Sequence, residues 1–321
     1  MSEILLSRYA DAIFWNARYV ERAENLARIL DVTDTFTRDA TGAQNWLSIV
    51  QLHSDEERFF ARTKKVTPEL VRWFYLLDST NPTSVVSAVR SARDNARALR
   101  PLISTEMWMQ MNVFHNWIAS LDGDDLAPGR LNEICRRIKE ACQMYTGITE
   151  GTFYRDQSWY FYEIGRYLER ADQTTRLLDM KYHLLLPQPT DVGSPIDVRQ
   201  WNALLRSAAA YHAYRKLHPR GMTPGQVAGF LLLNRQFPRS VYLCAHQIEL
   251  LLAELKARYG LRGGNGAAEQ LDSVRALLGD MTITQILAQG LHELLDLIQV
   301  RLNAVTRDLA ISFFGWLEEA A

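Results

Sequence analysis

The sequence has few cysteines and no pattern that pairs them. Its 321 residues include 3 cysteines, and no two of them form a Cys-x-x-C pair. A sparse, odd set of thiols is typical of a reduced cytosolic protein and argues against a disulfide framework. Cys135 and Cys142 fall on one face of an expected helix, where packing is their simplest role.

Metal, nucleotide and hydrolase motifs are also missing. There is no Glu-x-x-His pair of the di-metal carboxylate type, no Walker motif and no Gly-x-Ser-x-Gly elbow. His292 and Glu293 are not followed by a second histidine at metalloprotease spacing. The 7 histidines are scattered along the chain. We therefore expect no metal ion and no cofactor.

Neither charge nor hydrophobicity points to nucleic acid or a membrane. The chain has 36 basic and 37 acidic residues in intermixed order, so it exerts no bulk attraction on polyanions. The longest apolar runs, such as residues 227–233, are too short to span a bilayer. Glu3, Arg8 and Asp11 interrupt the N-terminal segment, unlike a secretory signal. We expect a cytoplasmic protein with no nucleic-acid or membrane partner.

What is present is a helical pattern along the whole chain. Apolar residues recur at three- and four-residue spacing, runs of alternating polarity are absent, and the 47% hydrophobic content is enough for a substantial core. Capping residues and first-turn prolines precede many of the apolar stretches. The sequence predicts an all-α bundle of about twelve helices, at about 7–38, 43–64, 68–78, 82–99, 104–121, 128–150, 156–185, 197–216, 224–235, 238–259, 266–279 and 282–317.

Two blocks of sequence occur twice, in the same order. Residues 18–31 (RYVERAENLARILD) match residues 166–179 (RYLERADQTTRLLD). Further on, TPELVRWFYLL at 67–77 matches TPGQVAGFLLL at 223–233, and the same frame aligns NPTSV at 81–85 with FPRSV at 237–241. Trp46 and Trp201 fall in nearly the same register. We interpret the chain as a tandem duplication with two packed halves, residues 1–154 and 155–321.

These motifs resemble the alpha-E family, a bacterial all-helical family named for its Glu-Arg motif and often tandemly duplicated. The resemblance covers most of the chain. One departure is Asp94, where the family pattern would place glutamate. The resemblance rests on residues 14–15, 18–25, 92–97, 104–108, 112, 165–172 and 237–241.

The resemblance implies which proteins this one works with, but not which reaction it carries out. The family is associated with circularly permuted ATP-grasp ligases and transglutaminase-like proteins. It has been proposed to serve a peptide synthesis or modification system. A protein partner of the ATP-grasp-type ligase or transglutaminase-like class is therefore expected.

The repeated motif concentrates charge on one arc of a helix that is otherwise largely apolar. At 100° per residue the first copy places its polar side chains together, and the second copy repeats the arrangement. Within the first helix, Glu21 would meet Arg18 and Asn25, while Arg22 would reach a neighbouring helix. We expect part of the cluster to be buried. The candidate polar site is Arg18, Glu21, Arg22, Asn25, Arg28, Arg166, Glu169, Arg170 and Arg176.

Two interpretations of this cluster remain open. In the first, it is a structural network of ion pairs that fixes the register of packed helices. In the second, the two Glu-Arg pairs meet across a pseudo-twofold axis and line one polar cleft, where arginine forks would bind carboxylate or phosphate. A carboxylate among arginines has a lowered pKa and is a poor general base, which weighs against catalysis by Glu21 or Glu169.

Two weaker sets of candidates lie elsewhere. The first is a polar and aromatic set on two consecutive helices, which either packs the helices together or binds a partner. The second lies at a helix start behind Pro238, where free N–H groups attract anions but a plain N-cap is the commoner role. These secondary candidates are Arg93, Asn95, Arg97, Glu106, Trp108 and Asn112, and Arg239 and Ser240.

Three functional hypotheses follow. No pairing of nucleophile and base is visible, which favours a non-catalytic scaffold or adaptor that docks an ATP-grasp-type ligase or its peptide product. The alternatives are an enzyme of amide-bond chemistry that uses Glu21 and Glu169, and a module that binds an anion or a peptide carboxylate.

Overall fold

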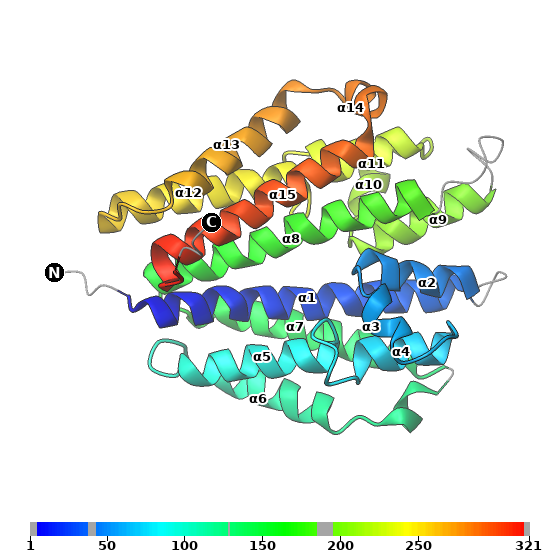
Figure 1. Cartoon of the computed structure of the whole chain (residues 1–321), viewed down its shortest axis with the longest axis horizontal. Helices are drawn as coiled ribbons and strands as arrows, with labels where there is room; N and C mark the ends of the chain where they lie inside the picture. The colour runs from blue at the N-terminus through cyan, green and yellow to red at the C-terminus, as the bar shows by residue number, and fades with distance from the viewer. Residues whose placement is uncertain (1–4, 38–42, 128, 185–194, 318–321) are drawn as a thin grey trace.

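The computed structural model describes residues 5–37, 43–127, 129–184 and 195–317 (Figure 1). Within these ranges all regular structure is helical, which confirms the all-α prediction, with fifteen α-helices rather than about twelve. A short 3₁₀ turn (Gly123–Leu126) and a π turn (Ala310–Phe314) complete the regular structure of these ranges. The helices are α1 (Ser7–Thr37), α2 (Ala43–Leu52), α3 (Glu56–Phe60), α4 (Pro68–Leu76), α5 (Val85–Ala98), α6 (Thr105–Ala119), α7 (Leu131–Thr152), α8 (Gln157–Leu184), α9 (Pro195–Ser207), α10 (Tyr211–Leu217), α11 (Pro224–Leu233), α12 (Val241–Tyr259), α13 (Asn265–Asp280), α14 (Ile283–Gln289) and α15 (Leu291–Leu309).

Two long helices, α1 and α8, lie side by side through the middle of the molecule (Figure 1). They run in the same direction, because Phe14 lies against Gly165 near their beginnings and Asn25 bonds Gln173 further along. A Cβ on Gly165 would lie 2.5 Å from the carbonyl oxygen of Phe14. Glycine at this position therefore allows the close approach of the two backbones, directly before the second Arg-Tyr-x-Glu-Arg motif.

The remaining helices surround this central pair in two similar groups. Helix α1 also packs against α5 and α7, while α8 packs against α12 and α15. Each central helix also contacts a helix of the other half, since α9 packs on α1 and α2 packs on α8. The division into repeats at residues 1–154 and 155–321 stays a prediction. Its boundary lies in the connection between α7 and α8.

Three of the expected helices are broken in the structure. The segments expected at 43–64 and 197–216 are interrupted at Ser54 and Ala209, two non-glycine residues with left-handed φ angles of 53° and 54°. The segment expected at 282–317 breaks at Gly290, whose φ is 112°. Ser54 and Ala209 are 155 residues apart, the same offset as Trp46 and Trp201, so the break occurs at the same point of both halves.

Helices α5 and α12 begin three residues later than expected. The caps are Ser84 and Ser240, whose hydroxyls accept hydrogen bonds from the backbone N–H groups of Ser87 and Leu243. Each proline, 82 and 238, lies in a tight turn that precedes the helix, in which the backbone N–H of the capping serine bonds the carbonyl oxygen three residues before it. The helix therefore starts at the cap and not at the proline.

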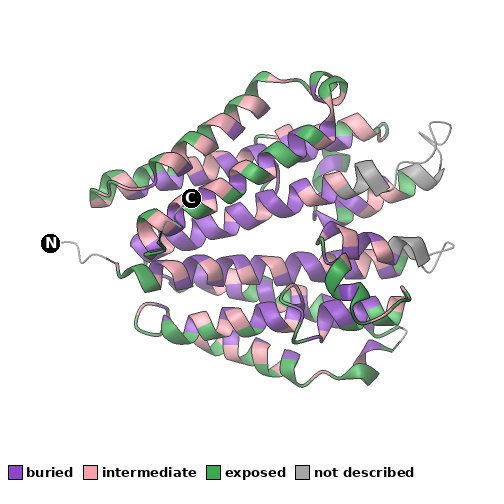
Figure 2. Ribbon diagram, viewed as in Figure 1, coloured by how far each residue is buried: buried purple, intermediate pink, exposed green. Residues whose placement is uncertain are grey.

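Burial is greatest along the two central helices (Figure 2). Figure 2 shows α1 and α8 mostly buried, while α6 and α13 present exposed residues to one side. All three cysteines are buried and free. Burial of Cys135 and Cys142 was expected from their helical spacing. Among the residues that the structure describes, no helix is both long and apolar enough to cross a bilayer.

Candidate functional site

Glu169 of α8 lies at the centre of the first Glu-Arg cluster. Its side chain is fully buried. Arg18 of α1 donates from Nε to Oε2 at 2.8 Å, and Arg22 donates from Nε to Oε1 at 2.8 Å and from a terminal nitrogen to Oε2 at 3.0 Å. Gln173 adds a hydrogen bond to Oε1 at 3.1 Å. Both arginines come from the other half of the chain, so this carboxylate joins the two halves.

Glu21 of α1 makes the reciprocal contact. Its Oε2 lies 2.9 Å from Nε of Arg170 on α8, and its Oε1 accepts from Arg239, which precedes α12. Glu21 is 3% exposed. The sequence predicted that Glu21 pairs with Arg18 and Asn25 of its own helix. This is wrong, because Arg18 and Asn25 instead bond side chains of α8. Arg22 does reach a neighbouring helix, as expected.

The two clusters are related by sequence but not identical in contacts. Arg166 is the counterpart of Arg18, but it bonds Glu163 of its own helix and lies 3.7 Å from Glu150. At Glu21, Arg239 makes the contact that the counterpart of Arg18 would otherwise make. The first half has Thr83 at the position of Arg239, so the sequence itself contains this difference between the two clusters.

The network continues toward the ends of α1 and α8. Arg28 pairs with Glu24 at 2.5 Å, and Arg239 lies 3.5 Å from the same carboxylate oxygen. On α8, Arg176 pairs with Asp172 at 2.9 Å. All nine residues of the candidate polar site therefore lie on these two adjacent helices. Eight of them form interhelical or intrahelical ion pairs, and Asn25 hydrogen-bonds Gln173 across the two helices.

The electrostatics of the glutamates follow from this packing. Burial alone would raise the pKa of Glu169, but the charges of Arg22 and Arg18 outweigh it and hold the pKa well below its ordinary value. The same balance, with Arg170 and Arg239, lowers the pKa of Glu21. Both groups stay ionised and engaged with cations, which leaves neither positioned to accept a proton from a substrate.

The secondary candidates separate into a packed set and an exposed set. Arg93 donates from Nε to the side-chain oxygen of Asn112 at 2.9 Å, and its guanidinium lies 5.7 Å from the ring centre of Trp108. These three side chains join α5 to α6. Arg97 and Glu106 are exposed, and Asn95 is half-buried. Ser240 caps α12, while Arg239 belongs to the Glu21 cluster.

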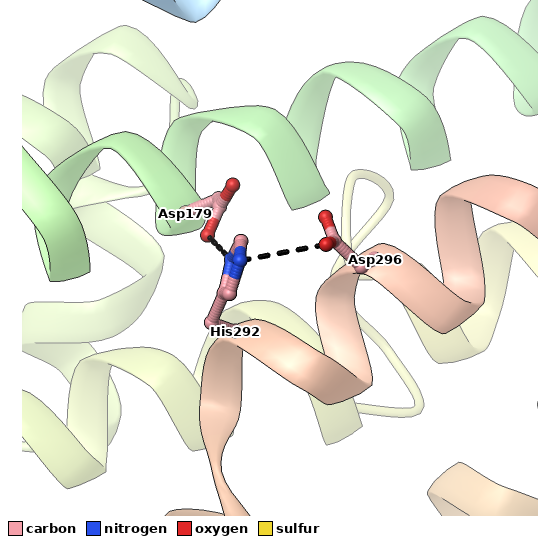
Figure 3. A group of neighbouring side chains, drawn as sticks. All are labelled: Asp179, His292 and Asp296. Carbon is pink, nitrogen blue, oxygen red and sulfur yellow. Dashed lines mark hydrogen bonds and ion pairs between the residues drawn. The ribbon is translucent and has the colours of Figure 1, made fainter.

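A group of one histidine and two carboxylates, separate from the Glu-Arg clusters, was not expected from the sequence (Figure 3). Nδ1 of His292 on α15 lies 2.7 Å from Asp179 of α8, and Nε2 lies 3.4 Å from Asp296. The hydrogen bond to Asp179 raises the pKa of His292. The two carboxylates approach different ring nitrogens, which point apart, so the arrangement suits a protonated imidazole between two acids better than one metal ion bound by all three groups.

Comparison with known proteins identifies the family. Residues 5–314 match the Alpha-E family, described as a predicted alpha-helical domain with a conserved ER motif. The chain belongs to the Alpha-E family. This Alpha-E chain has Glu-Arg pairs at 21–22, 57–58 and 169–170, and the first and last of these lie in the repeated block.

The curated relatives carry no assigned activity. The chain is 25% identical to an uncharacterized protein of Mycobacterium bovis and to one of Mycobacterium tuberculosis, with 94% of this chain aligned. A second uncharacterized protein of Mycobacterium tuberculosis is 24% identical. The chain spans 36% of the length of these relatives. No solved structure matches it.

Proposed function

We propose that this Alpha-E protein is a non-catalytic helical scaffold or adaptor of a cytoplasmic peptide synthesis or modification system. Its partner would be an ATP-grasp-type ligase, with a transglutaminase-like protein as a further component. The single observation that carries the proposal is that both motif glutamates are buried and each is neutralised by arginines, at least one of them from the other half of the chain.

The buried ion pairs around Glu21 and Glu169 support a structural role for the motif. Removing a charge from water costs several kcal/mol per ion, and pairing repays that cost only where the geometry is good. Here the cost is offset by forked contacts between α1 and α8, so the network fixes the position of one half on the other. A rigid pair of halves is what a docking surface requires.

Two further observations support the proposal, the first its adaptor role and the second its cytoplasmic location. The aligned region makes up 36% of its curated relatives, so in those proteins it stands beside other sequence. Burial raises the pKa of each of the three free thiols, so they are protected in the folded chain, and their unpaired state supports a reducing compartment.

The alternative of an amide-bond enzyme built on Glu21 and Glu169 is not favoured by these contacts. A substrate would have to displace arginines from carboxylates that are 3% and 0% exposed. The lowered pKa values of both groups make them weak bases near neutral pH. The structural interpretation requires neither displacement nor proton transfer.

The proposal is tested by mixing the purified chain with a purified circularly permuted ATP-grasp-type ligase, the partner class that the family resemblance implies. We expect a defined complex by size-exclusion chromatography and calorimetry, with a Kd in the micromolar range or tighter, about −8 kcal/mol. Folded Glu169→Gln, studied at low temperature, should bind the ligase as the parent does and leave its turnover unchanged. No complex at about 10 μM of each protein would contradict the adaptor role. Loss of product formation with binding intact would favour the enzyme instead.

A further inference from the structure

A pocket of about 620 Å³ lies between the two halves, away from the buried glutamates. Its lining comes from the second half of α1 and from α7 in the first half of the chain, and from α9 and the start of α10 in the second half. The volume is within the range of small-molecule sites, about 300–1,000 Å³. The side chains that matter for its chemistry are Arg28, Asp31, Lys139, Arg206, Tyr211 and His212.

Most of the charges that α1 and α7 contribute to the pocket are already paired. Lys139 donates to Oδ2 of Asp31 at 2.6 Å, and Asn132 donates to Oδ1 of the same residue at 2.7 Å. Arg28 is held by Glu24 at 2.5 Å. The carboxylate of Asp31 is therefore neutralised within the pocket and does not repel an anion strongly.

Arg206 of α9 differs from these groups. No carboxylate of the described residues pairs with it, and its guanidinium lies 4.3 Å from the ring centre of Tyr211. Stacking on a ring fixes the plane of a guanidinium while leaving its N–H edge free to donate. The pocket lining thus includes an arginine that stacks on Tyr211 and, within the described part of the chain, pairs with no carboxylate.

We propose that this pocket binds an organic ligand through an oxyanion group, a carboxylate or a phosphate, with Arg206 as the principal contact. A guanidinium edge matches either group with two parallel hydrogen bonds. The pocket is larger than a bare anion, and Val32 and Tyr211 offer apolar surface to the rest of the ligand. The inference does not depend on the adaptor role, because it concerns a different surface.

The basic character of the pocket is specific to this side of the molecule. By the Trp46 and Trp201 register, the position of Arg206 is held in the other half by Gln51. Where Asp31 meets Asn132, its counterpart Asp179 meets His292, and Asp296 adds an acid nearby. The repeated architecture alone therefore does not produce an anion-binding pocket.

The experiment titrates the full chain with inorganic phosphate, phenyl phosphate, benzoate and the uncharged control benzamide, by calorimetry and by thermal stabilisation. Arg206→Gln is compared with Arg215→Gln, an exposed arginine of α10 that does not line the pocket. We expect saturable binding of phenyl phosphate, of benzoate or of both, and weaker binding of inorganic phosphate. The affinity should fall at least about tenfold in Arg206→Gln and stay unchanged in Arg215→Gln.

The outcomes separate the possible ligand groups and can overturn the proposal. Preference for phenyl phosphate or for benzoate would assign the oxyanion as phosphate or carboxylate. Binding of benzamide as tight as that of benzoate would show that no anion is recognised. Equal affinity in both arginine variants, or no saturable binding of any probe up to about 10 mM, would overturn the site.

Discussion

Replacing Glu169 with glutamine removes the charge that holds two arginines in the interior while leaving the side-chain shape nearly unchanged. The carboxylate accepts three hydrogen bonds from Arg18 and Arg22, at 2.8, 2.8 and 3.0 Å. In the variant an NH₂ group faces guanidinium groups, and both cations stay in place without their counter-ion. Removing one partner of a buried ion pair costs about 3–5 kcal/mol.

This cost can be expressed as a change in melting temperature. Unfolding entropy near ~2.1 cal/mol/K per residue gives roughly 0.7 kcal/mol per degree for a chain of 321 residues. Glu169→Gln should therefore melt about 4–7 °C below the parent. The comparison is made by differential scanning calorimetry at pH 7, where the parent carboxylate is ionised.

Glu133→Gln is the matched control. The Glu133 side chain is 64% exposed and pairs with Arg136 of the same helix at 2.5 Å. Solvent screens exposed pairs almost completely, so this variant should melt within about 1.5 °C of the parent. If Glu169→Gln melts at the parent temperature or above it, the clamp interpretation is wrong, and the charges are held at a cost to stability, as in many functional sites.

Three further predictions concern other parts of the structure. Burial, with the charges of Arg176 and Arg22, lowers the pKa of His53 to about 3, so only the unfolded chain gains this proton as the pH falls below 6.5. Stability should then fall from pH 6.5 toward 4.5 by up to about 1.4 kcal/mol per pH unit, and urea titrations of His53→Gln should show a shallower slope. Burial raises the pKa of all three cysteines and so disfavours the reactive thiolate. The native protein should therefore react with a thiol reagent only at the rate at which it unfolds locally or globally. Ala209→Gly should stabilise the chain by about 0.5–1 kcal/mol in urea, because Ala209 has a φ of 54°.

Each of these predictions has a result that would contradict it. Equal pH slopes for the parent and His53→Gln would mean that His53 takes up its proton in the folded chain as well. Labelling of the native thiols at the rate of a free cysteine would mean that they are accessible. Destabilisation by Ala209→Gly would remove the argument that the α9–α10 break strains its backbone.

The sequence predicted the helices well where caps and periodicity agree. Thr67 and Thr223 cap α4 and α11 as expected, each followed by a first-turn proline. The breaks at Ser54 and Ala209 could not be foreseen, because neither residue favours a left-handed φ and the apolar pattern continues through both. Gly290 did carry a local signal, since glycine inside a helical pattern is a common break point.

The sequence predicted that the charged residues of the motif share one arc of their helix, but not which side chains they contact. The 3.6-residue period places Glu21 and Arg22 on one arc, which the structure shows, but only tertiary packing decides that Arg18 bonds Glu169. Arg239 is far from the motif in sequence, and its contact with Glu21 depends on where the chain before α12 comes to lie. The group at His292 was missed because its members, Asp179 and Asp296 included, come from two separate helices.

The claim that the Glu-Arg motifs join the two halves is tested most directly by a double-mutant cycle between Arg22 and Glu169. Unfolding free energies of Arg22→Gln, Glu169→Gln and the double variant are measured against the parent by urea titration. A direct buried contact predicts a coupling of about 1–3 kcal/mol, with the double variant less destabilised than the sum of the single changes. Additive effects, with no coupling, would contradict the account.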